Sequence, residues 1–189
     1  MNYCYIPFLL LFFACDNGQP ASEKTIAVNT DTIHTPGTIK QKTSAALFNG
    51  SNKIETGLTT RQELLSFANT LIGIPYLYAS VDPVYGFDCS GFITYVFNHF
   101  DIAVPRSSVD FTDIETEVPL SEASPGDLIL FTGTDSLIRI VGHMGIVASL
   151  DNNQVSFIHS TSGKANGVTI TPLNDYYMGR FIKVIRIFP

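Results

Sequence analysis

One cysteine of this chain lies in a sequence context that suits a nucleophile. Cys89 is in the segment 86–92, GFDCSGF, where a turn leads into an apolar stretch with helical spacing. A thiol attacks carbon as the thiolate, and the free N–H groups and positive dipole of a helix N-terminus stabilise that anion. Taken alone, the segment fits a small buried hydrophobic residue equally well, because free cysteine is often found inside proteins. Both interpretations stay open at this point.

Two histidines in β-type segments downstream of Cys89 could supply a base and its partner. His143 lies in the sequence GHMGIV, and His159 lies in FIHS. Side chains alternate along a strand, so His143 shares a face with Gly145, which leaves room for another group. If the two strands pair in a hairpin, the imidazoles come within hydrogen-bonding distance. His143 could then take the thiol proton and later protonate a leaving amine, while His159 fixes its tautomer.

The composition limits the function classes. With 189 residues, of which 45% are hydrophobic, the chain can build one well-packed core but hardly a second full domain. Its net charge is −6, and no run of Lys or Arg is present. A nucleic-acid-binding protein would show a basic patch or stripe. We therefore expect no nucleic acid as a partner.

The N-terminus resembles an export signal of the bacterial lipoprotein type. Residues 5–14 form an apolar run, too short for a bilayer-spanning helix of about 20 residues, and a small residue precedes Cys15. This arrangement resembles the lipobox, in which the cysteine is lipidated and becomes the mature N-terminus. We expect a signal peptide at residues 1–14, a lipid anchor on Cys15 and a flexible, polar tether over residues 15–57. The alternatives are an ordinary cleaved signal peptide and a wrongly assigned start codon.

Cysteine usage adds weight to a functional role for Cys89. Cys4 would be lost with the signal peptide and Cys15 would carry the anchor, so Cys89 would have no partner for an intramolecular disulfide. Disulfides form readily in the oxidising compartments outside the cytoplasm. An exported domain that keeps one unpaired thiol is therefore expected to use it.

The elements that would position these residues are helices followed by strands. A capping-box sequence, TRQE at residues 60–63, starts a helix that Gly73 and Pro75 end, and a second apolar helix follows Cys89. Short β-type runs come afterwards, at residues 128–132, 141–150, 155–161, 168–173 and 181–188. This order predicts an α+β domain over residues 58–189, with an antiparallel sheet and helices on one face.

Five short motifs occur along residues 60–189: IPY at 74–76, FDCSGF at 87–92, VPRS at 104–107, SPGDL at 124–128 and GHMGIV at 142–147. In these motifs and their order, this part of the chain resembles the NlpC/P60 family. The resemblance implies a papain-like fold, in which the nucleophilic cysteine begins a helix packed on the antiparallel sheet. It also implies a bacterial cysteine peptidase that cuts peptidoglycan stem peptides between γ-D-glutamate and a diamino acid, usually meso-diaminopimelate. No cofactor is implied.

The same resemblance assigns roles to individual residues. Cys89 would be the nucleophile, His143 the general base and acid, and His159 the residue that orients His143. Tyr76 would place its hydroxyl near the oxyanion.

Further residues would shape substrate binding. Asp88 and Ser90 would help to bind the polar end of the stem peptide. Arg106 could bind a substrate carboxylate, but pairing with a nearby acid is favoured. The family often has two glycines just after the Pro-Tyr segment, where this chain has Ala79 and Ser80, so we expect a reshaped cleft rim over residues 79–85.

Other functions remain compatible with these residues. The same triad could serve an amidase or an acyltransferase acting on another amide or ester. A zinc site built from Cys89, His143 and His159 is a chemically different alternative, because one cysteine and two histidines are a plausible ligand set. A catalytically idle wall-binding domain is disfavoured by the intact set of three residues.

Overall fold

The computed structural model of the chain describes residues 48–114, 116–151 and 154–189. The expected signal peptide, Cys15 and most of the expected tether lie outside these residues. No helix in the described part of the chain is long and apolar enough to cross a membrane.

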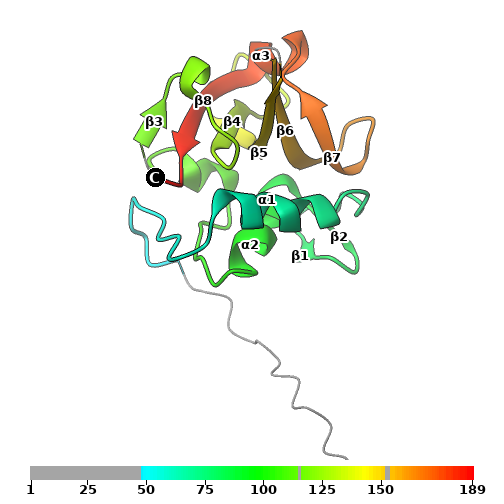
Figure 1. The fold of residues 1–189 in the computed structure, drawn as a ribbon. Coiled ribbons are helices and arrows are strands. Elements are labelled where there is room, and N and C mark those ends of the chain that lie inside the picture. The colour runs from blue at the N-terminus through cyan, green and yellow to red at the C-terminus, as the bar shows by residue number, and fades with distance from the viewer. Residues whose placement is uncertain (1–47, 115, 152–153) are drawn as a thin grey trace, which may run out of the picture. The chain divides into compact units, whose positions relative to one another are not determined.

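A six-stranded antiparallel sheet forms one layer of the domain (Figure 1), in the order β3-β8-β4-β5-β6-β7. Strands β4 to β7 pair with their neighbours in sequence, and β8 returns to lie between β3 and β4. The strands are β3 (Thr116–Val118), β4 (Leu128–Thr132), β5 (Val141–Asp151), β6 (Gln154–Thr161), β7 (Gly167–Pro172) and β8 (Phe181–Arg186). The predicted α+β class is confirmed.

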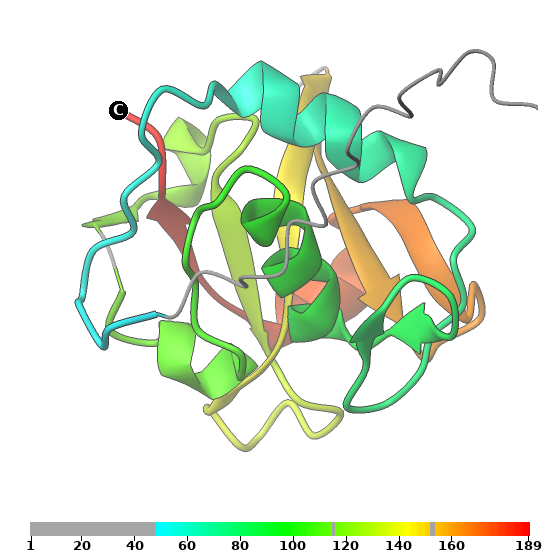
Figure 2. The same cartoon turned by 90° about the horizontal axis from the view of Figure 1, so that it is seen from below.

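Helices α1 (Arg61–Thr70) and α2 (Cys89–Asn98) cover one face of this sheet, as the view in Figure 2 shows. The predicted capping box is present at the start of α1. The Thr60 hydroxyl accepts from the Glu63 N–H at 3.2 Å, and the Glu63 carboxylate accepts from the Thr60 N–H at 2.9 Å. The connection between the two helices carries a small ribbon of β1 (Val81–Asp82) and β2 (Gly86–Phe87).

The core between the helices and the sheet depends on α2. Its side chains Phe92, Ile93, Val96 and Phe97 are fully buried against the apolar face of the sheet. Complete burial of one such side chain contributes roughly 1.5–3 kcal/mol to folding. The core therefore fixes α2, and with it the first residue of the helix, Cys89.

The opposite face of the sheet is also covered, which differs from the predicted one-sided arrangement. A second buried cluster there includes Ile129, Phe131 and Phe157 from the strands and Tyr177 from α3 (Asp175–Arg180). Helix α3 has only six residues, DYYMGR, too few to show a helical period in the sequence. Two short 3₁₀ turns, η1 (Ser108–Phe111) and η2 (Leu120–Glu122), complete the described elements.

The packed domain begins earlier than the boundary expected at residue 58. Ile54 is 2% exposed and belongs to the main core, and Phe48 packs against that core. Phe48 and Ile54 therefore contact the core from within the segment that was expected to be a tether. Two apolar side chains six residues apart in a polar segment show no period, so the sequence carries little sign of these contacts.

Gly91 allows the chain before α2 to cross closely over the helix. A Cβ atom at this position would lie 2.0 Å from the Ser80 backbone oxygen. Gly91→Ala should therefore lower the free energy of unfolding by about 1–3 kcal/mol, although alanine normally favours a helix. Gly179→Ala in α3 is the matched control, because nothing lies within 4 Å of the added atom. Urea unfolding of both variants tests this, and equal effects would contradict the role of the close contact.

Candidate active site

Cys89 occupies the first position of α2, and Asp88 caps the helix. The Asp88 carboxylate accepts from the Gly91 N–H at 2.6 Å, which orders the first turn. The Cys89 side chain is partly exposed, and its Sγ lies 3.9 Å from the Gly142 backbone oxygen at the start of β5. The thiol therefore sits at the junction between the helical layer and the sheet.

Three strands carry a chain of polar side chains beside the thiol. His143 Nε2 on β5 lies 2.9 Å from His159 Nδ1 on β6, and His159 Nε2 lies 2.9 Å from Thr171 Oγ1 on β7. If His143 Nδ1 is to accept the thiol proton, its Nε2–H donates to His159, whose own Nε2–H then donates to the Thr171 hydroxyl. The predicted contact between the two histidines is confirmed, and Thr171 extends it.

Gly145 makes the histidine contact possible. A Cβ atom at Gly145 would lie 2.9 Å from the Ile158 oxygen and 3.1 Å from His159 Cβ. The space that a glycine was expected to leave beside His143 is thus filled by β6 itself. The close approach of the two strands brings the imidazoles together.

Burial sets the protonation states of these groups. It lowers the pKa of His143 well below the usual value, and the electrostatic interactions with His159 and the Arg180 cation lower it further. Burial, followed by the charge of Arg180, lowers the pKa of His159 to about 3. Both imidazoles are therefore neutral at neutral pH.

The Cys89 thiol is also held in its neutral form. Burial raises its pKa most, and the negative charge of Asp88 raises it further, while the N–H groups of Ser90, Cys89 and Met144 act in the opposite direction. The expected stabilisation of a thiolate at a helix N-terminus is present but is outweighed. The resting pair is consequently a thiol beside a neutral imidazole, which suits proton transfer to His143 during attack.

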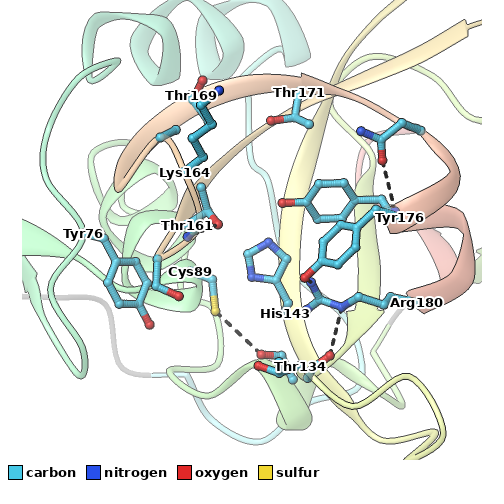
Figure 3. Close-up of a pocket in the computed structure, with 17 residues that line it drawn as sticks. Tyr76, Cys89, Thr134, His143, Thr161, Lys164, Thr169, Thr171, Tyr176 and Arg180 are labelled. Atoms are coloured by element: carbon cyan, nitrogen blue, oxygen red, sulfur yellow. Dashed lines mark hydrogen bonds between the residues drawn. The ribbon is translucent and has the colours of Figure 1, made fainter.

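Cys89 and His143 line one cavity of about 980 Å³ (Figure 3). Tyr76 lies on the Cys89 side of this cavity, as expected. Burial raises the pKa of its hydroxyl most, and the electrostatic interactions with Cys89 and Asp88 raise it further. The Tyr76 hydroxyl therefore stays protonated and can donate a hydrogen bond.

Asp88 and Ser90 are placed differently from Tyr76. Both are buried, neither lines the cavity, and both bind the Arg106 guanidinium, at 2.7 Å to Asp88 Oδ2 and 3.0 Å to Ser90 Oγ. The predicted pairing of Arg106 with a nearby acid is confirmed. A contact of Asp88 or Ser90 with substrate stays a prediction, and the contacts observed here support the start of α2.

Two side chains of the site were missed in the sequence. Thr171 sits in a predicted strand, where alternation alone could have placed it on the face of His159 once the pairing was known. Arg180 ends α3 and is 9% exposed, although an arginine in a short polar segment is usually a surface residue. Its burial follows from α3 packing on the sheet, which the sequence did not predict.

The described residues offer no group of three or more His, Cys, Asp or Glu side chains that could hold a metal ion. The facing nitrogens of His143 and His159 are hydrogen-bonded to each other. The zinc alternative therefore has no ligand set in this part of the chain.

Comparison with known proteins links the chain to a family of hydrolases. A sequence model of the NlpC/P60 family matches residues 73–186. The gamma-DL-glutamyl hydrolase of Bacillus subtilis is 33% identical over 129 residues, which cover 68% of this chain and 30% of that protein. A probable endopeptidase NlpC homolog of Haemophilus influenzae is 27% identical over 180 residues, covering 93% and 91% of the two chains.

The fold is found in solved structures as well. The crystal structure of an NlpC/P60 family protein from Bacillus cereus superposes with a TM-score of 0.62 at 27% identity, covering 74% of this chain and 43% of that one. The papain-like α+β arrangement is thus shared. The chain spans less than half of the Bacillus subtilis and Bacillus cereus proteins, so both contain further sequence outside the match.

Because both histidines are buried in their neutral form, the free energy of unfolding should fall as the pH is lowered. The unfolded chain protonates His159 near pH 6.5, whereas the folded chain does so only near pH 3. Between these two pH values the unfolded state therefore binds more protons. For one such group, the free energy of unfolding falls by up to about 1.4 kcal/mol for each unit by which the pH decreases. His143 acts in the same direction.

Urea unfolding between pH 7 and pH 4 measures this slope. His159→Gln should give a shallower slope below pH 6.5 than the wild type, and the two proteins should respond alike to pH above it. An unchanged slope in the variant would contradict the burial of a neutral His159.

Proposed function

The chain belongs to the NlpC/P60 family, and from this premise we propose that it is a cysteine peptidase that hydrolyses peptidoglycan. One observation carries the proposal. The Cys89 thiol at the start of α2 shares a cavity with His143, whose imidazole is oriented through His159 and Thr171. A nucleophile, a base and an orienting group in this order are what acyl transfer by a thiol requires.

The reaction begins with proton transfer from Cys89 to His143 as the sulfur attacks the amide carbonyl. The oxyanion is stabilised by the Cys89 backbone N–H and the Tyr76 hydroxyl. The imidazolium of His143 then protonates the departing amine, which leaves a thioester on Cys89. Water hydrolyses this thioester with His143 as the base, and the free thiol is restored.

The bond we propose is the amide between γ-D-glutamate and the diamino acid, meso-diaminopimelate, of a stem peptide. The name of the Bacillus subtilis relative, a gamma-DL-glutamyl hydrolase, supports a γ-glutamyl carbonyl as the site of attack. The same catalytic residues would also serve an amidase or an acyltransferase. An acyltransferase would pass the acyl group to an added amine, and an amidase would cut a different bond, so the products distinguish the three activities.

Cys89→Ala should reduce hydrolysis of L-Ala-γ-D-Glu-meso-diaminopimelate by more than roughly 1,000-fold, because no other group in the cavity can form the thioester. Mass spectrometry of the products measures the loss and identifies the bond that is cut. The thermal unfolding midpoint of the variant serves as the control for folding. Cleavage at the wild-type rate by a folded Cys89→Ala variant would refute the proposed mechanism.

We also propose that the protein is exported and anchored to a membrane of the bacterial cell envelope through a lipid on Cys15. The support is the apolar run at residues 5–14, which ends in the small residue Ala14 directly before Cys15. An anchor of this kind would concentrate the enzyme near the cell wall.

Metabolic labelling with an alkyne fatty acid in a bacterial host tests the anchor. The wild type should be labelled and should fractionate with membranes, and Cys15→Ala should lose the label. Equal labelling of the two proteins, or an unlabelled wild type, would exclude lipidation at Cys15.

A further inference from the structure

The cavity beside Cys89 is positively charged although the chain as a whole is acidic. Its 17 lining residues include two cations, Lys164 and Arg180, and no Asp or Glu. The net charge of the chain is −6. A cleft lined by one sign of charge raises the local concentration of oppositely charged ligands. The cavity is therefore suited to an anionic group.

Arg180 is the buried cation of this cavity. Its guanidinium donates to the backbone oxygens of Gly133 and Thr132, both at 2.9 Å, and to the Tyr176 hydroxyl at 2.8 Å. In the described part of the chain, Arg106 and Arg186 form ion pairs with aspartates, whereas no carboxylate pairs with Arg180. Carbonyl and hydroxyl groups orient the guanidinium but leave its charge uncompensated, and an uncompensated buried charge is costly.

Tyr176 connects Arg180 to the cavity through a hydrogen bond. Because its hydroxyl oxygen accepts from Arg180, its own O–H is available to donate to a bound group. The side chain lines the cavity and is 58% exposed. Figure 3 shows Tyr176 and Arg180 on the side of His143 that faces away from Cys89, with Lys164 on the opposite rim near Thr169.

We propose that Tyr176 and Arg180, with Lys164 on the rim, bind a free carboxylate of the substrate close to the amide that is cut. This inference rests on the proposed function. A γ-glutamyl peptide offers this group from two sources. The γ-linkage leaves the α-carboxylate of the D-glutamate free, and meso-diaminopimelate brings a side-chain carboxylate that lysine lacks.

Binding of a carboxylate here would also assist the base. The positive charge of Arg180 lowers the pKa of both His143 and His159. A carboxylate held by Arg180 and Tyr176 offsets that charge, so His143 becomes a stronger base when the substrate is bound. Substrate recognition and proton transfer from the thiol would thus be coupled.

Three synthetic peptides test the proposal in the full-length protein. The first is L-Ala-γ-D-Glu-meso-diaminopimelate, the second has the glutamate α-carboxylate converted to an amide, and the third has L-Lys in place of the diaminopimelate. The wild type should prefer the first peptide by roughly 10-fold or more in kcat/KM over the analogue that lacks the bound carboxylate. Whether the second or the third peptide loses that factor identifies the source.

Tyr176→Phe and Lys164→Gln are the test variants, and Arg180 is kept because it also holds the end of β4. We expect Tyr176→Phe to reduce kcat/KM about 10-fold and Lys164→Gln about 3-fold for the preferred peptide, with little change for the analogue. Lys53→Gln is the matched control, because it removes the same charge from an exposed residue outside the cavity. This control should behave as the wild type with all three peptides.

The outcomes distinguish a failure of the proposed function from a failure of the carboxylate site alone. If the wild type cleaves none of the peptides, the proposed function fails and the carboxylate site fails with it. If it cleaves all three equally well, or if the test variants lower all three rates by the same factor, only the carboxylate site is overturned. Loss of the preference in Tyr176→Phe but not in Lys53→Gln supports it.

Discussion

The hydrogen bond between His143 and His159 is the contact on which the site depends. It joins two strands at 2.9 Å, and both imidazoles are buried. Its geometry requires the close approach of β5 and β6 that Gly145 allows. Thr171 on β7 extends the contact through a hydrogen bond to His159. The six-stranded sheet therefore acts as the frame that holds one imidazole in one tautomer.

The helical layer meets this frame through the beginning of α2. The buried aromatic face of the helix fixes its axis, while Asp88, held by Arg106 and the first turn, fixes its end. Asp88 has opposite effects on chemistry and structure, since it stabilises the helix that presents Cys89 but raises the pKa of the thiol. In the proposed mechanism, a positioned neutral thiol loses its proton only as it attacks the substrate.

Much of this arrangement could be predicted from the sequence, for identifiable reasons. The strands β4 to β8 have strong β-type runs, and their predicted bounds lie within two residues of those observed. The pairing of His143 with His159 followed from a short hairpin and a glycine. By contrast, β3 has three residues and α3 has six, too few for a periodic signal. Arg180 was missed with α3, because its burial results from packing on the far face of the sheet and from no local pattern.

The raised pKa of the Cys89 thiol has a consequence for the lifetime of the enzyme. Peroxides and alkylating agents react with thiolates, and a thiol that stays protonated without substrate reacts slowly with them. The described part of the chain holds no second cysteine that could rescue an oxidised sulfur by forming a disulfide. In the proposed mechanism, keeping the proton on sulfur until a substrate arrives would therefore protect the nucleophile from irreversible oxidation.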